Sequence, residues 1–449
     1  MTIKVSKFGG TSLATRAQVE KCLDIMLADK SRKFMVVSAP GARCKGDPKI
    51  TDLLILAAGE FKDAGKSAAA GNVISRFSEI MPENPDLSAR LGEELRARLA
   101  QTGADNYEES LKAFGEYASA RAITAILQAR GVRAGFIDPM ALGFVIIGND
   151  HSAKPDPKCY RKISRNLKAF NKLDIAVIPG FYGADKSGQL VTLPRGGSDI
   201  SGAVIARAAG AGFYENWTDE DGLRRADPRI VGHAATIPEM TYDEARELAY
   251  MGFKLQDACF APIKGKSIVL QVRNTNNPDH PGTRIVDTRE AAPEERIAGI
   301  ACEQNFVSIG MRKMYIDEEV GFGRKMLSVS EKMNLPYEHT LDGVDSVSLV
   351  LARKYLKDKN TLDEVVAKLR KVCRPEQMMF RDLALVSVAG IGMKNHFDVH
   401  ARTFTALARE KIAVRMIDEG ADDLSFFIGV DNDRAADAIR TIYGEFFPA

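Results

Sequence analysis

Apolar runs typical of buried strands alternate with helical patterns over the first two-thirds of the chain. Residues 3–8 (IKVSKF) predict a strand, and residues 16–29 predict a helix, because apolar residues from Val19 to Met26 recur at helical spacing. Continuous apolar strands separated by helices indicate a mainly parallel sheet that is covered on both faces. Further strands are predicted over residues 33–41, 173–181, 189–194 and 211–219.

Residues 60–120 have a different composition, in which small, charged and polar side chains dominate. One interpretation is a group of helices that stand out from the sheet as a lid or a subunit contact. Solvated surface helices explain the same pattern equally well, so both interpretations stay open.

The pattern changes again near residue 290, where the charged, proline-bearing segment 287–296 predicts a linker. Beyond it lies a weak internal repeat of two βαββαβ units, each with strands rich in Ile and Val and two amphipathic helices. The units are predicted over residues 296–376 and 380–449. Two strand candidates precede the first of these helices, and the one at about residues 297–304 is a candidate for the sheet of the second unit.

The composition is that of an ordinary soluble protein. With 449 residues, the chain is expected to form two or three domains. The net charge of +2 gives no overall attraction to nucleic acid or to an anionic membrane, so any anion binding must be local. No signal peptide and no apolar run of about 18 residues is recognised, so we expect a cytoplasmic protein without a membrane span.

The residue types that bind metals are scattered. None of the six cysteines forms a CxxC pair, which favours free thiols in a reducing compartment. His396 and His400 have metal-ligand spacing, but the glutamate of HExxH is absent, and surface or capping histidines explain them better. We therefore predict no metal site built by the protein alone.

The stretch SKFGGTSLA places Lys7 near the end of a predicted strand, with Gly9 and Gly10 in the loop before a predicted helix. Glycines let backbone N–H groups approach an anion closely, and a helix N-terminus adds partial positive charge. Lysine supplies a full charge that can follow phosphate oxygens. The spacing is neither GxxxxGK[ST] nor GxGxxG, so an ordinary tight turn explains it equally well.

A second glycine pair, residues 196–197, stands in LPRGGSD at another strand-to-helix junction. We expect Ser198 or Asp199 to cap the helix that starts near residue 200, but capping leaves Arg195 and the glycines unexplained. Two glycine loops that carry Lys7 and Arg195 could enclose a polyanion, since ligands bind at the carboxyl ends of strands in open α/β sheets. Asp199 then has a second possible role, which is to orient Lys7 by a charge-assisted hydrogen bond.

The stretch NWTDEDGLRRADPRI, residues 216–230, holds the single tryptophan, a Thr-Asp pair, a glycine turn and an Asp-Pro-Arg sequence. Two interpretations are open. Polarity alone favours an ordinary acidic turn with a buried tryptophan. The alternative is a purine-binding wall, with Arg224 and Arg229 near phosphates.

These stretches, in this order, resemble the aspartokinases of the amino-acid kinase superfamily. The resemblance covers nearly the whole chain and rests on KFGGTS, FGEYASA at residues 114–120, RGGSD, WTD followed by DPR, and the tandem C-terminal units. It implies a carbamate-kinase-like three-layer α/β/α catalytic domain over residues 1–290, followed by two ACT-type α+β modules. It also implies transfer of the γ-phosphoryl group of ATP, with Mg²⁺, to the side-chain carboxylate of L-aspartate, the first step of lysine, threonine and methionine synthesis.

The resemblance implies a role for individual residues. Lys7 would be the main transition-state cation, and Asp199 would position Lys7 or hold magnesium through water. A carboxylate is already a deprotonated nucleophile, so positioning and charge neutralisation suffice. The implied substrate residues are Thr51, Glu116 for the α-ammonium group, Arg195 for the α-carboxylate, and Ser198. The implied ATP-binding residues are Lys7, Gly9, Gly10, Gly196, Gly197, Thr218, Asp219, Arg224, Arg229 and Lys254.

Two features depart from the family pattern. Arg224 stands where the family commonly has a tyrosine or another large residue. Residues 252–262 read GFKLQDACFAP where the family commonly has GAKVLHP, so Lys254 is retained but the His-Pro pair is not. Both departures affect the nucleotide pocket. No homoserine dehydrogenase segment follows the repeat, so we expect the monofunctional type.

The resemblance further implies that the paired modules bind an end-product amino acid and shift the kinase domain toward an inactive state. An acidic residue there suits a cationic effector, so we expect inhibition by L-lysine, with L-threonine as the alternative. We also expect a homodimer or a higher homo-oligomer assembled through the modules. Core packing is another explanation of the Met-rich stretch at residues 310–327. The candidate effector contacts are Met314, Asp317, Gly321, Phe322, Asp345 and Ser346.

Two other functions stay open. A kinase of the same fold could act on glutamate, acetylglutamate or a nucleotide, although the tandem modules and the FGE sequence argue against it. A catalytically silent amino-acid sensor would retain the fold. Lys7, Glu116, Arg195 and Asp199 argue against a sensor, whereas the altered KLQDA sequence keeps it open.

Overall fold

The computed structural model describes residues 2–148, 152–194, 196–252, 256–356 and 358–448. The chain folds into two compact units. The first comprises Met1–Leu223, Thr236–Tyr242 and Leu255–Arg289, and the second comprises Arg224–Ala235, Asp243–Lys254 and Glu290–Ala449. Two short segments that lie within the predicted domain 1–290 therefore pack with the second unit.

An eight-stranded sheet forms the centre of the first unit. Its strands are β1 (Lys4–Phe8), β2 (Arg32–Val37), β3 (Ala134–Phe136), β6 (Ile175–Pro179), β9 (Phe213–Thr218), β10 (Glu239–Thr241), β11 (Val269–Asn274) and β12 (Thr283–Val286). The order is β10-β12-β11-β9-β1-β2-β6-β3, and every neighbouring pair except β11–β12 is parallel. The carboxyl ends of β1, β2, β6 and β9 therefore lie at one edge of the sheet, and the predicted mainly parallel sheet is confirmed.

One predicted strand is not part of this sheet. The sequence 189–194 forms β8 (Leu190–Thr192), which pairs with β7 (Tyr182–Ala184) in a separate antiparallel hairpin. A short second hairpin joins β4 (Ile146–Ile147) and β5 (Lys154–Pro155). Local apolar character predicted the extended backbone of residues 190–192, but it did not indicate the partner strand.

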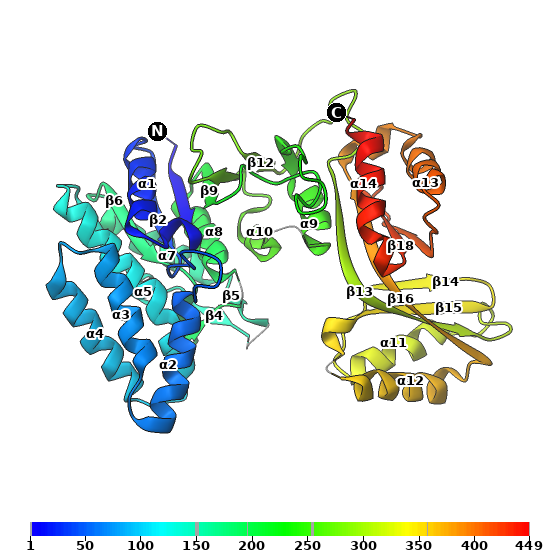
Figure 1. Ribbon diagram of the computed structural model, residues 1–449, viewed down its shortest axis with the longest axis horizontal. Helices are drawn as coiled ribbons and strands as arrows, with labels where there is room; N and C mark the ends of the chain where they lie inside the picture. The colour runs from blue at the N-terminus through cyan, green and yellow to red at the C-terminus, as the bar shows by residue number, and fades with distance from the viewer. Residues whose placement is uncertain (1, 149–151, 195, 253–255, 357, 449) are drawn as a thin grey trace. The chain divides into compact units, whose positions relative to one another are not determined.

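The helices of the first unit are α1 (Arg16–Leu27), α2 (Ile50–Ala64), α3 (Ala68–Ile80), α4 (Pro85–Leu99), α5 (Tyr107–Ala129), α6 (Pro139–Leu142), α7 (Cys159–Leu167), α8 (Gly197–Ala209) and α10 (Phe260–Ile263). The predicted face of α1 is buried, including Val19 and Met26. Helices α2 to α5 pack against one another (Figure 1), and residues such as Val73, Leu91 and Phe114 join the main apolar core. These helices therefore bury one face in the core and expose the other, and their role as a lid or a subunit contact stays a prediction.

The second unit contains a six-stranded antiparallel sheet in the order β14-β15-β13-β16-β18-β17. The strands are β13 (Gly299–Arg312), β14 (His339–Asp342), β15 (Ser346–Ala352), β16 (Gln377–Ala389), β17 (Met416–Glu419) and β18 (Ser425–Val430). The helices are α9 (Tyr242–Tyr250), α11 (Phe322–Lys332), α12 (Lys359–Cys373), α13 (Val399–Arg409) and α14 (Ala435–Phe446).

The long strands β13 and β16 run through both modules of this unit, with α11 and α12 near one end and α13 and α14 near the other (Figure 1). The two strand candidates before the first predicted helix form the single strand β13, with a register shift between Glu303 and Phe306. Residues 299–303 pair with the part of β16 that also pairs with β18, whereas residues 306–312 pair with β15. The predicted fold class is confirmed, while the module boundaries stay a prediction.

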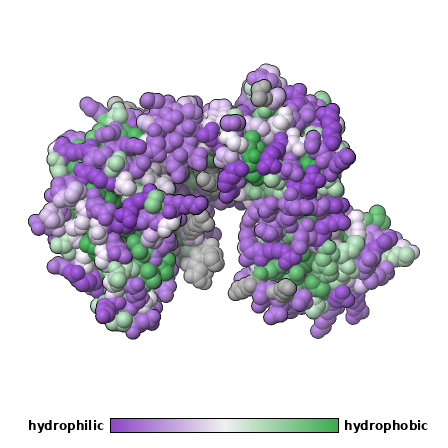
Figure 2. All heavy atoms as spheres, in the orientation of Figure 1, coloured by the Kyte–Doolittle hydropathy of each residue, from purple (hydrophilic) through white to green (hydrophobic). Residues whose placement is uncertain are grey.

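The surface is mostly polar. Hydrophilic residues cover most of the face shown in Figure 2, and apolar residues form scattered groups on it. Among the residues that the structure describes, no helix combines the length and the apolar character needed to span a bilayer.

Candidate active site

The first glycine loop follows β1, the strand that carries Lys7. Gly9 and Gly10 lie between this strand and a short 3-10 turn. A Cβ atom on Gly10 would lie 2.9 Å from the carbonyl oxygen of Ala39, because this loop packs directly against the loop that follows β2. That close backbone approach explains the glycine. The N–H group of Gly9 donates to the carbonyl oxygen of Trp217 at 3.1 Å, so its donation to a phosphate stays a prediction.

The second glycine loop begins α8. Gly196 is the N-cap residue with a φ of 80°, in the left-handed region that favours glycine. A Cβ atom on Gly197 would lie 2.7 Å from Cβ of Leu193. The expectation that Ser198 or Asp199 caps the helix is wrong, because the helix begins at residue 197 and both side chains lie inside its first turn.

Lys7 and Asp199 meet between the two glycine loops. The Lys7 ammonium nitrogen lies 2.6 Å from Oδ1 of Asp199, and both side chains are largely buried. Asn216 on β9 joins the pair, since its amide donates to the same Asp199 oxygen at 3.0 Å and its carbonyl oxygen lies 3.5 Å from the Lys7 nitrogen. Asp199 also lies in the first turn of α8, where the helix dipole stabilises a negative charge. The result is a cation held in a fixed position at the carboxyl end of β1.

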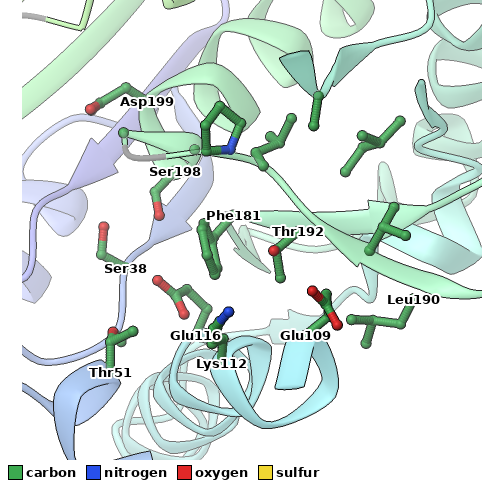
Figure 3. Close-up of a pocket in the computed structure, with 18 of the residues that line it drawn as sticks. Ser38, Thr51, Glu109, Lys112, Glu116, Phe181, Leu190, Thr192, Ser198 and Asp199 are labelled. Carbon is green, nitrogen blue, oxygen red and sulfur yellow. The ribbon is translucent and has the colours of Figure 1, made fainter. Parts of the chain in front are cut away.

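A cavity of about 1370 Å³ opens beside this pair. It is lined from several directions: by the loops after β1 and β2, by α2 and α5, by the β7–β8 hairpin and by the start of α8. Figure 3 shows Ser38, Thr51, Glu116 and Ser198 around one space, each from a different element. The structure therefore brings together Lys7 and four other residues predicted for catalysis and substrate binding: Thr51, Glu116, Ser198 and Asp199.

Glu116 on α5 is the buried acid of this cavity, with 5% of its surface exposed. Its Oε2 atom has no hydrogen-bond partner among the described residues. Burial raises the pKa of this carboxyl to about 8, although the backbone N–H of Ala39 and the charge of Lys7 act in the opposite direction. An incompletely bonded buried carboxyl at a cavity can accept hydrogen bonds from a cationic ligand group.

Several cavity residues were missed by the sequence analysis. Ser38 follows β2 and Phe181 follows β6, so both stand at the edge where the parallel strands end. The rule that ligands bind at this edge could have indicated both. Phe181 also has a φ of 75°, a strained value for a residue with a side chain. Glu109 and Lys112 of α5 line the outer cavity and had no recognisable signal.

The residues predicted for the nucleotide are only partly described. Thr218 ends β9, next to β1 in the sheet, and its hydroxyl donates to Asp219 at 3.1 Å. Arg224 and Arg229 belong to the second unit, where Arg229 is mostly exposed and pairs with Asp227 at 2.6 Å. Arg195 and Lys254 lie outside the described residues. The nucleotide roles stay predictions.

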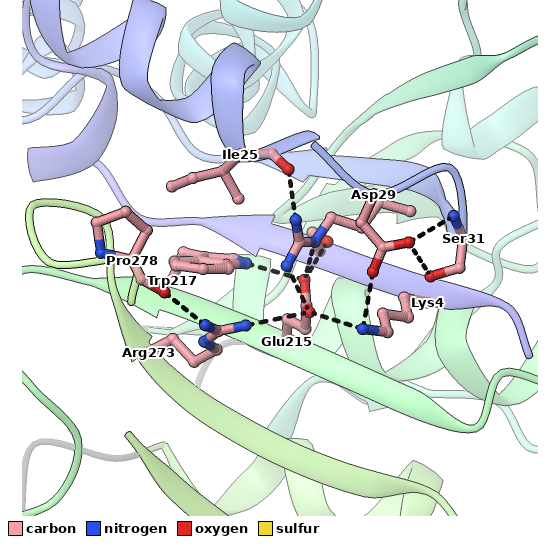
Figure 4. Close-up of polar contacts among 10 residues, drawn as sticks. Lys4, Ile25, Asp29, Ser31, Glu215, Trp217, Arg273 and Pro278 are labelled. Carbon is pink, nitrogen blue, oxygen red and sulfur yellow. Dashed lines mark hydrogen bonds and ion pairs between the residues drawn. The ribbon is translucent and has the colours of Figure 1, made fainter. Parts of the chain in front are cut away.

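Trp217 lies in a buried polar cluster on the opposite face of the sheet (Figure 4). Its indole N–H donates to Glu215 at 3.1 Å. The guanidinium groups of Arg32 and Arg273 lie over its ring, at 5.4 and 4.6 Å from the centroid. The Trp217 ring is therefore closed to a purine, whereas the nucleotide roles of the other residues in this stretch stay predictions.

The predicted effector residues lie in the first module of the second unit. Met314 and Asp317 are exposed between β13 and α11, whereas Phe322 is buried in the core of the module. Asp345 accepts the backbone N–H of Tyr315 at 2.9 Å. Gly321 caps α11 with a φ of 81°, and Ser346 begins β15 at the surface.

Comparisons with known proteins identify the family of this chain. The model of the amino acid kinase family matches residues 2–274, and an ACT domain model matches residues 386–446. The chain is 33% identical to aspartokinase 3 of Bacillus subtilis over 454 residues, which cover 99% of each chain. The chain therefore belongs to the amino acid kinase family and, within it, to the aspartokinases.

Two solved structures resemble the whole chain. Aspartate kinase of Clostridium acetobutylicum is 35% identical, with a TM-score of 0.85 over 99% of this chain and 100% of that one. E. coli aspartokinase III in complex with aspartate and ADP is 25% identical, with a TM-score of 0.80 over 99% of this chain and 100% of that one.

Proposed function

We propose that this chain transfers the γ-phosphoryl group of ATP to the side-chain carboxylate of L-aspartate, giving 4-phospho-L-aspartate. The observation that carries the proposal is the cavity beside Lys7 and Asp199, into which the buried acid Glu116 faces. The cavity combines a fixed cation, Lys7, which suits a phosphoryl group, with an acid, Glu116, which suits an ammonium group. The E. coli relative, solved with aspartate and ADP, supports the same pair of ligands.

The chemistry needs little from the protein beyond position and charge. The aspartate side-chain carboxylate is already ionised, so its oxygen attacks the γ-phosphorus without a general base, and ADP leaves with the electrons of the broken P–O bond. Lys7 neutralises negative charge on the transferring group. Asp199 holds the Lys7 ammonium in place through the 2.6 Å ion pair.

The substrate residues divide between the two ends of aspartate. Ionised Glu116 accepts the α-ammonium group, and Thr51 and Ser198 supply hydroxyl groups from α2 and α8. Arg195 binds the α-carboxylate in this proposal, because a guanidinium can hold a carboxylate by two parallel hydrogen bonds. ATP contacts come from the two glycine loops and from the predicted nucleotide residues Thr218, Asp219, Arg224, Arg229 and Lys254.

Magnesium accompanies ATP in this proposal. Mg²⁺ is commonly held by one or two carboxylates together with substrate phosphates, rather than by a cage of protein ligands. Asp199 is a carboxylate at the cavity and fits that requirement, directly or through water. Among the described residues, no cluster of three or more His, Cys, Asp or Glu side chains could hold the ion alone. When bound, the ion neutralises charge on the β- and γ-phosphates.

A hydroxamate assay tests the function, because hydroxylamine traps an acyl phosphate. The purified enzyme is incubated with ATP, Mg²⁺ and either L-aspartate, L-glutamate or N-acetylglutamate. We expect hydroxamate from aspartate alone. Product from another acid would reassign the substrate, and no product from any acid would favour a silent sensor.

We also propose that the two ACT-type modules regulate the enzyme and assemble it into a homodimer or a larger homo-oligomer in the cytoplasm. The C. acetobutylicum relative is described as an allosteric enzyme, which supports regulation. Exposed Asp317 and partly buried Asp345 suit a cationic effector, so L-lysine is the proposed inhibitor and L-threonine the alternative. The effector must bind the two states with different affinity, by about 1–3 kcal/mol.

Regulation is tested with the full chain at sub-saturating aspartate. We expect L-lysine to lower the rate and Asp317→Asn to weaken that inhibition without changing the uninhibited rate. Insensitivity of the wild type to both lysine and threonine would exclude the proposed effectors. Light scattering with and without lysine reports the oligomer.

A further inference from the structure

The strand β9 presents different polar residues on its two faces, because side chains alternate across a strand. Tyr214 and Asn216 face α8, where both contact Asp199. Glu215 and Trp217 lie on the opposite face and contact each other at 3.1 Å. One strand therefore supports the active-site pair on one side and a separate buried cluster on the other.

Tyr214 holds the backbone of Asp199. Its buried hydroxyl donates to the carbonyl oxygen of Asp199 at 2.9 Å. The tyrosine ring packs so tightly against α8 that a Cβ atom on Gly202 would lie 2.5 Å from the hydroxyl oxygen. The first turn of α8 is thereby fixed against β9.

Asn216 holds the side chain of the same residue. Its amide donates to Oδ1 of Asp199 at 3.0 Å, while its own carbonyl oxygen lies 3.5 Å from the ammonium nitrogen of Lys7. Asn216 is also the residue on β9 that pairs in register with Lys7 on β1. A carboxamide can donate and accept at the same time, whereas a carboxylate can only accept and an apolar side chain can do neither.

We propose that Asn216 is a positioning residue for phosphoryl transfer, an inference that rests on the proposed function. Asn216 fixes Oδ1 of Asp199, so the carboxylate cannot rotate away from Lys7. The Lys7 ammonium has three N–H donors. Asp199 and Asn216 take two of them, and the third is left to point into the cavity that Lys7 lines. Asn216 therefore acts on the reaction through the direction of the Lys7 charge.

A purely structural role for Asn216 predicts a loss of stability without a loss of kcat. Ser6, the residue before Lys7 on β1, supplies a matched control. Ser6 pairs in register with Glu215, and its hydroxyl donates to that carboxylate at 2.7 Å on the opposite face. Ser6 is fully buried, and Asn216 is nearly so. Ser6→Ala and Asn216→Leu thus each remove a cross-strand polar contact from the same strand pair, but only the second contact reaches Lys7.

The experiment compares Asn216→Leu, Asn216→Asp and Ser6→Ala with the wild type, using kcat, KM and thermal unfolding. Hydrogen bonds to charged groups stabilise by amounts that correspond to rate losses of about 10- to 100-fold. We expect a loss of kcat in that range for Asn216→Leu, with the KM for aspartate nearly unchanged. Asn216→Asp keeps the shape but loses the donor and adds a negative charge, so we expect a lower kcat and a raised KM for ATP. Ser6→Ala should lose thermal stability and retain kcat.

Two outcomes would overturn the inference. The first is a wild-type kcat in Asn216→Leu, or in the isosteric Asn216→Asp if the leucine variant does not fold, in an enzyme that phosphorylates aspartate. The second outcome is independent of activity and is measured by labelling Lys7 with an amine-reactive ester, followed by mass spectrometry. We expect labelling to be faster in Asn216→Leu than in the wild type and unchanged in Ser6→Ala. Equal labelling in the leucine variant excludes the positioning role. If the variants label as expected but the wild type does not phosphorylate aspartate, the proposed function is contradicted. The role of Asn216 in positioning Lys7 is then still supported.

Discussion

Two buried glutamates of the first unit, Glu215 and Glu116, differ in how completely their carboxylates are paired. Glu215 accepts hydrogen bonds from Ser6 at 2.7 Å, from Arg32 at 2.8 Å and from Trp217 at 3.1 Å, and Figure 4 shows the contact with Trp217. Lys4 and Arg273 add two more cations at 3.8 Å. Glu116, by contrast, leaves Oε2 without a partner among the described residues and faces a cavity (Figure 3).

The pKa values of the two carboxyls diverge for the same reason. Burial alone raises the pKa of each. At Glu215, hydrogen bonds and charge from Arg32, with further hydrogen bonds from Ser6 and Trp217, outweigh burial and hold the pKa below its usual value. At Glu116, burial prevails and the pKa is about 8. The carboxylate of Glu215 is paired within the framework of the sheet, whereas the incomplete pairing of Glu116 suits the ammonium-binding role that we propose for it.

The largest effect should come from the cation on the active-site face. Lys7→Ala removes the charge that we assign to the transferring phosphoryl group, and such cations contribute about 10³-fold or more to turnover. We expect kcat to fall by that amount, while the KM for aspartate changes little. Steady-state kinetics with both substrates measures it. A variant with near-wild-type turnover would remove Lys7 from the mechanism.

The next effect concerns stability. Glu215→Gln leaves the nearly buried Arg32 without its anion, and breaking one partner of a buried pair typically costs about 3–5 kcal/mol. We expect the free energy of unfolding to fall by this amount, with kcat retained at a temperature where the variant is folded. Urea unfolding and an assay at low temperature separate the two. Loss of kcat at unchanged stability would place Glu215 in the catalytic machinery instead.

Much of the framework could be predicted from local patterns. Apolar runs predicted the parallel strands, and helical spacing predicted the buried face of α1. The β8 segment shows the limit, because local apolar character does not choose between the main sheet and a hairpin. The start of α8 shows another, since a left-handed glycine cap at Gly196 and a serine cap produce similar sequences.

The site was predicted in part, and the remainder depends on register. The glycine loops indicated Lys7 and Asp199, which the structure brings within 2.6 Å of each other. Asn216 was missed because the positioning role that we propose for it depends on its pairing with Lys7 between β9 and β1. No local sequence pattern contains that pairing. Among the described residues, Oε2 of Glu116 has no hydrogen-bond partner. This is likewise a result of packing, which only the folded structure shows.

The third prediction removes the charge of the incompletely paired carboxylate. Glu116→Gln should raise the KM for aspartate by about 10- to 100-fold, the range expected for a lost charged hydrogen bond. The KM for ATP should move much less. Calorimetric titration with each ligand checks the assignment. Retained aspartate binding with lost ATP binding would contradict it.

The fourth prediction uses the pKa of about 8. Below that pH the Glu116 carboxyl of the free enzyme is mostly protonated, so it attracts an ammonium group weakly. The KM for aspartate should therefore fall as pH rises toward about 8, by up to about tenfold per pH unit. Glu116→Gln should abolish this dependence. An unchanged pH profile in the glutamine variant would assign the titration to another group.

The last effect is the sharpest test of the comparison, because the same substitution should change stability in opposite directions at the two glutamates. The folded-state pKa of Glu116 is raised, so the folded chain binds this proton more tightly than the unfolded chain does. Wild-type stability is therefore lost as pH rises from the unfolded pKa of about 4.3 through about 8. Glutamine does not titrate, so Glu116→Gln should be more stable than the wild type by up to about 1.4 kcal/mol for each pH unit above the unfolded pKa. The gap should widen up to pH 8 and then level off, whereas Glu215→Gln destabilises. Thermal unfolding of the wild type and both variants, at intervals of about one pH unit from pH 5 to pH 9, measures the sign of each stability difference. Destabilisation by both substitutions would show that Glu116 is paired as completely as Glu215.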